Sequence, residues 1–105
     1  MTTPTNSRFD LLTVIVSMRS KAGKEQDLRE ALKVLIEPTK QEAGCVDYHW
    51  HQGISDPAVF YFYENWESIE HHDAHMRAPH MQEIIGRVEE LLDNAPTIER
   101  LRRIG

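Results

Sequence analysis

The chain has one cysteine, no apolar run long enough to cross a bilayer and no stripe of basic residues. A single cysteine cannot form an internal disulfide, which favours a reducing cytoplasm. Without a long apolar segment or a signal-peptide pattern, we expect no contact with a membrane. A net charge of −5 without a basic patch argues against nucleic-acid binding. The absences therefore predict a soluble cytoplasmic protein.

What the chain does contain suffices for one small domain. Hydrophobic residues make up 40% and charged residues 28% of its 105 residues, which is typical of a globular protein. A chain of this length can bury a single modest core. We expect residues 1–10 to be a flexible tail and residues 11–105 to form the domain.

The spacing of apolar residues predicts the order β-α-β-β-α-β. Strands are expected where β-branched and aromatic residues gather, at residues 11–19, 45–52, 58–66 and 97–104. Apolar residues at helical spacing predict helices over residues 28–42 and 81–92, with a short helix between Ser68 and Pro79. This order predicts an α+β fold of the ferredoxin-like split β-α-β kind, an antiparallel sheet with helices on one face.

Local breaks and strand faces refine this expectation. Pro38 should kink the first helix near residues 34–37, and Gly44 should end it. Side chains two residues apart share a strand face. The pattern therefore predicts these three sets: Leu12, Val14, Val16 and Met18; Val46, Tyr48 and Trp50; Phe60, Phe62, Glu64 and Trp66. The uncovered sheet face needs a partner, which favours a homodimer formed through it.

Residues 60–80 hold most of the unusual side chains. His80 lies in the first turn of a helix, where the macrodipole disfavours imidazolium, so a neutral imidazole there could accept a proton or simply anchor the Pro79 turn. His71 and His75 have the four-residue spacing of paired metal ligands, with Asp73 and His80 nearby. Because no HExxH pattern is present, we predict no metal site and expect His71 and His72 to be solvated.

The segment YENWES at residues 63–68, followed by Ala74-His75 and APHM at residues 78–81, resembles the antibiotic biosynthesis monooxygenase family, especially its small bacterial quinol-monooxygenase-like members. The first strand with Gly23, and EAGC at residues 42–45, extend the resemblance over residues 11–104. It implies a dimeric α+β barrel that oxygenates quinols or polycyclic phenols without flavin, haem or metal. The family also includes haem-degrading enzymes and an isomerase of a phosphorylated sugar derivative.

Cofactor-free oxygenation needs a base near the substrate hydroxyl, donors to the oxyanion and apolar walls. His75 matches the recurring helix histidine of the family, which makes it the first candidate for the base, with His80 second; the alternative is that His75 only packs its helix. The candidate residues for binding a small aromatic substrate are Trp66, Glu64, Tyr48, Trp50, Phe62, Asn65 and Thr13. The aromatic candidates also fit a core, and Glu64 either orients a histidine or, as we favour, binds backbone donors of the next turn.

Other functions fit the same resemblance. A small-molecule isomerase with a phosphorylated ligand would need cationic side chains in the pocket, from Arg77, Arg87 or the C-terminal arginines, which we expect instead at the edge of the last strand. The resemblance to haem-degrading relatives implies an asparagine on the first strand and a haem-ligating histidine on the later helix. Haem degradation is disfavoured here, because residues 13–18 include no asparagine and the helix after His80 has no histidine. A ligand-binding dimer without oxygenase activity remains an alternative, because a fold alone does not confer chemistry.

Overall fold

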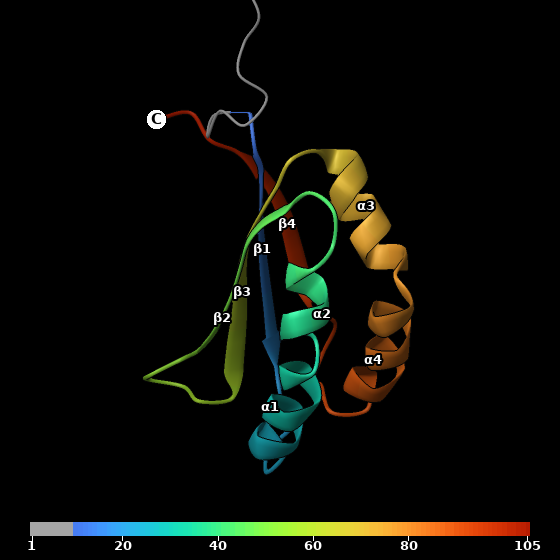
Figure 1. Ribbon diagram of the computed structural model, residues 1–105. Helices are drawn as coiled ribbons and strands as arrows, with labels where there is room; N and C mark the ends of the chain where they lie inside the picture. The colour runs from blue at the N-terminus through green and yellow to red at the C-terminus, as the bar shows by residue number, and fades with distance from the viewer. Residues whose placement is uncertain (1–9) are drawn as a thin grey trace, which may run out of the picture.

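The computed structural model describes residues 10–105, in which four strands and four helices form one sheet with a helical layer on one of its faces (Figure 1). The strands, in the sheet order β2-β3-β1-β4, are β1 (Leu12–Arg19), β2 (Cys45–Gln52), β3 (Val59–Trp66) and β4 (Thr97–Arg102), and each neighbouring pair is antiparallel. The helices are α1 (Glu25–Lys33), α2 (Ile36–Lys40), α3 (Ile69–Arg77) and α4 (Pro79–Glu89). The predicted ferredoxin-like α+β fold is confirmed. The predicted tail lies outside the described residues, apart from Asp10.

The core fills the space between the sheet and the helices. Strand residues two apart point to the same side, so Val14 of β1 and Phe60 and Phe62 of β3 all face the helices and are buried. The helices and the turn between α1 and α2 contribute the buried residues Leu28, Ala31, Leu32, Leu35, Met81, Ile84 and Val88. The predicted core faces of β1 and β3 are therefore correct.

The break between α1 and α2 follows from Pro38. It is the third residue of α2, in the first turn, where a missing backbone N–H breaks no intrahelical hydrogen bond. The connection to β2 then requires Gly44, whose φ is 80°. A Cβ at this position would also lie 2.2 Å from Cγ of His71, so the loop packs directly on α3.

A bulge in β2 corrects the expected face of Val46. Cys45 is paired with Trp66 and Asp47 with Asn65, which leaves Val46 without a partner position on β3. The extra residue turns the Val46 side chain outward, where it is 43% exposed, while Tyr48 stays on the core side. Val46 therefore does not share the face of Tyr48 and Trp50.

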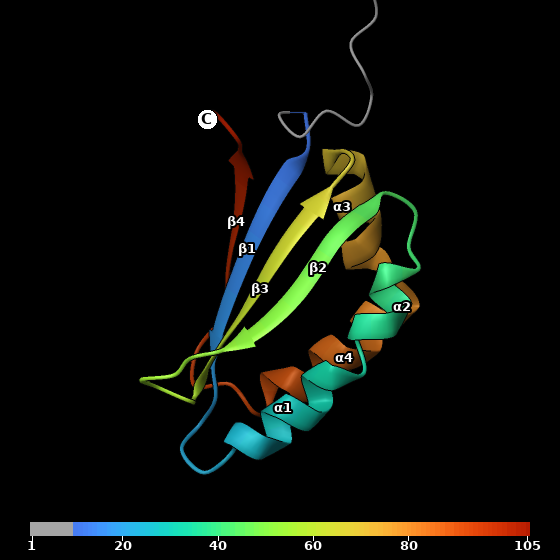
Figure 2. The ribbon, with the colours of Figure 1, turned by 60° about the vertical axis from the view of Figure 1, so that its left-hand side comes forward.

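The second face of the sheet carries no described helix (Figure 2). Apolar side chains on this open face remain partly exposed, namely Ile15, Tyr61, Tyr63 and Leu101. None of the described helices combines the length and apolar character needed to cross a membrane.

Candidate functional site

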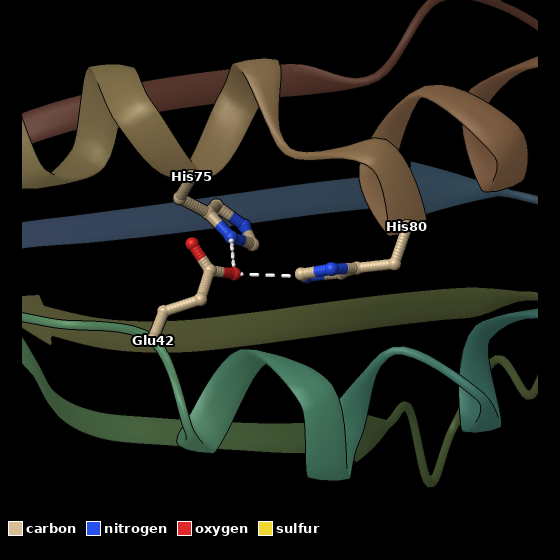
Figure 3. Close-up of side chains that lie close together, drawn as sticks. All are labelled: Glu42, His75 and His80. Atoms are coloured by element: carbon tan, nitrogen blue, oxygen red, sulfur yellow. Dashed lines mark hydrogen bonds and ion pairs between the residues drawn. The ribbon is translucent and has the colours of Figure 1, made fainter.

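Two histidines from consecutive helices converge on one carboxylate oxygen (Figure 3). The Oε2 atom of Glu42, in the loop after α2, lies 2.7 Å from Nδ1 of His75 and 2.8 Å from Nε2 of His80. An ionised carboxylate can only accept, so both imidazoles donate their N–H to it. Each histidine is thereby fixed in orientation by the nitrogen that bonds Glu42.

The junction between α3 and α4 places the two histidines. Ala78 is extended, with φ −63° and ψ 145°, because the residue before a proline is disfavoured in the helical region. Pro79 then begins α4 at its first turn, as predicted. His75 therefore comes from the last turn of α3 and His80 from the first turn of α4, on either side of a sharp bend.

Contacts at the start and in the middle of α3 hold the helix that carries His75 in place. The predicted N-cap is confirmed, since Oγ of Ser68 accepts a hydrogen bond of 3.1 Å from the backbone N–H of His71. From β4, Arg100 donates Nε–H to Nδ1 of His72 at 3.1 Å and forms an ion pair with Asp73. Arg100 thus lies in the edge strand β4, as predicted, but it also links the sheet to α3, which was not predicted.

His75 has the surroundings of a general base. Its side chain is almost completely buried, and this burial lowers its pKa, although Glu42 acts in the opposite direction. Because Nδ1–H is donated to Glu42, the neutral ring carries its lone pair on Nε2. A carboxylate that fixes the tautomer of a histidine is also found in hydrolytic triads, where it prepares the histidine to act as a base.

A cavity of about 200 Å³ lies beside His75, between the sheet and the helices. Its walls are mainly apolar, with contributions from Met18, Phe62, Met76, Ile84, Ile85 and Val88. The polar side chains on its wall are Tyr48, Glu64, His72, His75 and Glu89. Such a chamber holds a small apolar ligand and presents a few polar groups to it.

Glu64 is the buried carboxyl group of this cavity. Its side chain accepts a 2.9 Å hydrogen bond from Nε1 of Trp66, and Nε2 of His72 lies 4.0 Å from the same oxygen. Burial raises the pKa of Glu64 to about 7. The favoured interpretation, that Glu64 binds backbone donors of the following turn, is wrong, because its partner is the indole of Trp66.

His72 also departs from expectation. It was predicted to be solvated, but it is 2% exposed and its ring packs near those of Trp66 and His75. Burial, reinforced by the charge of Arg100, lowers the pKa of His72 to about 4. Residues three apart share a helix face, so the spacing of His72 and His75 in the sequence already indicated that the two rings lie on the same side of α3.

The structure brings some of the predicted substrate residues together with His75. Tyr48, Phe62 and Glu64 line the cavity, and burial raises the pKa of Tyr48 far above its ordinary value. His80 is outside the cavity wall and reaches the site through Glu42.

The other predicted substrate residues lie elsewhere. Trp66 is fully buried against His75, with ring centroids 4.8 Å apart, and Trp50 borders a separate hollow beside Arg29. Thr13 and Asn65 lie on the open sheet face, where they hydrogen-bond to each other at 2.7 Å. These four residues are not brought to the cavity.

Sequence reasoning missed Glu42 as a site residue. It is separated from His75 by 33 residues, and no local pattern connects the two. The predicted neighbours His71 and Asp73 are engaged elsewhere, with Ser68 and Arg100 respectively. Among residues 10–105, one group of three His, Cys, Asp or Glu side chains has its potential ligand atoms all within 4.8 Å of one another. The group is Glu42, His75 and His80.

Comparisons with known proteins agree with this architecture. The Escherichia coli K12 protein named probable quinol monooxygenase YgiN is 30% identical over 82 residues, which cover 69% of this chain and 79% of that protein. An uncharacterized Synechocystis protein is 25% identical over 83 residues, but the match spans only 56% of its length. Among solved structures, a conserved protein from Methanosarcina mazei Go1 has a TM-score of 0.87 and 30% identity, covering 92% of this chain and 96% of its own. Residues 11–87 match the family model described as antibiotic biosynthesis monooxygenase, and the chain therefore belongs to this family.

Proposed function

We propose that the protein is a monooxygenase that oxidises a quinol or polycyclic phenol with O₂ in the cavity beside His75, without a bound cofactor. Family membership supports the reaction class, and similarity to a probable quinol monooxygenase supports the substrate class. The observation that carries the proposal is His75 itself, which lines an apolar cavity while Glu42 holds its Nδ1–H.

In the proposed reaction, His75 takes the hydroxyl proton of the substrate on Nε2. The resulting phenolate gives an electron to O₂ much more readily than the neutral phenol does. For a quinol, the products are a hydroxyquinone and water: one oxygen atom enters the ring, the other leaves as water, and the ring supplies all four electrons. Glu42 stabilises the imidazolium that forms, and the apolar walls keep water away from the reactive intermediate.

The remaining polar groups of the cavity suit a substrate with two oxygen functions. Glu64, with a pKa of about 7, can donate or accept a hydrogen bond near neutral pH. The hydroxyl of Tyr48 stays protonated, since its pKa is raised. We assign to these two side chains the orientation of the substrate oxygen that His75 does not deprotonate.

The homodimer through the open sheet face is part of the proposal. Four partly exposed apolar side chains, Ile15, Tyr61, Tyr63 and Leu101, lie on that face. A two-fold symmetric contact would bury this self-complementary patch on both copies.

The alternative of an isomerase for a phosphorylated ligand has less support. The described residues that line the cavity include no lysine or arginine. Arg100, the C-terminal arginine nearest to the cavity residue His72, is engaged by Asp73. A phosphate group would therefore enter an apolar chamber without a charge partner, which is costly.

Oxygen consumption with a panel of reduced naphthoquinones tests the proposal. The wild-type protein should exceed the rate of autoxidation, and His75→Ala should lose about 10²–10⁴-fold in rate, the usual contribution of a general base. His71→Ala is the matched control, because it removes an imidazole from α3 that is hydrogen-bonded to Ser68 instead of lining the cavity. Wild-type rates equal to autoxidation across the panel, or a fully active His75→Ala, would refute the proposal.

A further inference from the structure

We propose that Glu42, His75 and His80 also form a binding site for a divalent transition-metal ion, for which Zn²⁺ is a suitable probe. The three donor atoms all lie within 4.8 Å of one another and come from three different segments of the chain (Figure 3). No other set of this kind is found in residues 10–105. The inference differs from the metal pair that the sequence spacing suggested, since His71 does not take part.

The chemistry of the donors selects the class of ion. Two imidazole nitrogens and one carboxylate oxygen suit Zn²⁺, Fe²⁺, Co²⁺ and their neighbours in the first transition row, whereas Mg²⁺ and Ca²⁺ prefer sites made of oxygen. Three protein donors also leave at least one coordination position for water, as in metal sites that bind a further ligand.

The distances are close to those that an ion requires. Bonds of roughly 2.0–2.2 Å from the metal to nitrogen and oxygen place the donor atoms about 2.8–3.6 Å apart at right or tetrahedral angles. The two nitrogens now lie 2.7 and 2.8 Å from Oε2 of Glu42. An ion therefore needs the two N···O separations to widen, by at most about 0.9 Å, and the two nitrogens, which lie within 4.8 Å of each other, to come into the same range as it replaces the two hydrogen bonds.

Access to the site does not depend on opening the cavity. The side chains of His80 and Glu42 are 27% and 16% exposed, so an ion can arrive from the surface at the bend between α3 and α4. Each imidazole keeps one proton when the ion binds, since the proton moves to the ring nitrogen that points away from the metal. No charged group has to be buried without a partner.

Metal binding should inhibit the reaction, a consequence that rests on the proposed function. With the ion on Nδ1, the proton of His75 lies on Nε2, the nitrogen that must accept the substrate proton. The three side chains would thus have two alternative states. Without metal they form two hydrogen bonds and His75 can act as a base; with a bound ion His75 cannot accept the substrate proton.

Calorimetric titration of the chelator-treated full chain with Zn²⁺ tests the site without any substrate. We expect one ion per chain, and the Co²⁺-loaded protein should show the visible absorption bands of a nitrogen- and oxygen-bound ion. Glu42→Gln and His80→Ala should each weaken binding at least 10–100-fold, the loss known even for outer-shell partners. Glutamine preserves the volume of Glu42 and His80 is partly exposed, so both variants should fold, as a far-ultraviolet circular dichroism spectrum will verify.

His49→Ala is the matched control, because it removes an imidazole that lies 3.7 Å from Asp47 on the opposite sheet face. Its affinity should equal that of the wild type. The inference would be overturned if the wild type bound no detectable zinc. It would also be overturned if Glu42→Gln and His80→Ala both bound zinc as tightly as the wild type, or if His49→Ala lost binding. Oxygen consumption by metal-free protein is read separately, so either proposal can fail while the other stands.

Discussion

Replacing Glu64 with glutamine should change how the stability of the protein depends on pH. Glu64 is 2% exposed, and burial raises its pKa from 4.5 to about 7. Between these two values the folded protein holds a proton that the unfolded chain releases. The stabilising contribution is therefore complete below pH 4.5 and is lost as the pH rises through about 7.

The size of the effect follows from the two pKa values. One pKa unit corresponds to about 1.4 kcal/mol. The rise from 4.5 to about 7 thus predicts that wild-type stability falls by on the order of 3 kcal/mol, relative to the variant, between about pH 4 and pH 8. Glutamine does not titrate, and its amide oxygen can still accept the hydrogen bond from Trp66.

A second buried group, His72, changes the free energy of unfolding with pH in the opposite direction. The pKa of His72 is lowered to about 4, so its contribution is present above pH 6.5 and is lost as the pH falls towards 4. His72 is present in both proteins. Because Nε2 of His72 lies 4.0 Å from Oε1 of Glu64, the difference between wild type and Glu64→Gln measures the carboxyl group together with its interaction with His72.

Urea unfolding followed by tryptophan fluorescence at pH 5, 6, 7 and 8 provides the measurement, at one protein concentration in case the chain associates. Glu67→Gln is the control, because it removes one negative charge from an exposed neighbouring position. If the free energies of unfolding of wild type and Glu64→Gln run parallel within about 1 kcal/mol over this range, Glu64 is ionised in the folded protein and the reasoning fails.

Two further predictions concern the fold and the open sheet face. Gly44→Ala should lower the free energy of unfolding by more than about 1 kcal/mol, because φ is 80° and a Cβ would lie 2.2 Å from the His71 ring; Gly86→Ala, in α4 with nothing within 4 Å, should raise it by about 0.5–1 kcal/mol in urea titrations. Equal effects of the two substitutions would contradict this account. Tyr61→Glu should convert a dimer into a monomer in analytical ultracentrifugation, whereas Ile54→Glu, which replaces a fully exposed loop residue, should not. A dimer that survives Tyr61→Glu would indicate a different interface.

The order of elements was predictable because it depends on local chemistry. Three local features determine the elements. They are the alternation of apolar residues in β1 and β3, the helical spacing of apolar residues around Leu32, and the interruptions at Pro38 and Pro79. Each depends only on residues a few positions away in the sequence. Each of these features produced the element expected of it. The predicted strands differ from the observed ones only at their ends.

The parts that escaped prediction depend on contacts between distant segments. Val46 turns outward because β2 must keep register with β3 on both sides of a bulge, and the register is a property of the pair of strands. Arg100 contacts His72 and Asp73 only because the fold brings β4 close to α3. Glu42 has no neighbour in sequence that would mark it as the shared partner of two histidines.

The bend between α3 and α4 explains why His75 and His80 can meet one oxygen atom at all. In a continuous α-helix each residue turns about 100° around the axis, so side chains five residues apart point about 140° away from each other. His75 and His80 would then face different neighbours, and Glu42 could contact only one of them. The extended backbone of Ala78, imposed by Pro79, removes this restriction and places the two rings 6.2 Å apart by their centroids. Pro79 therefore contributes to the site without touching any reacting group, because it determines which side chains share the Glu42 carboxylate.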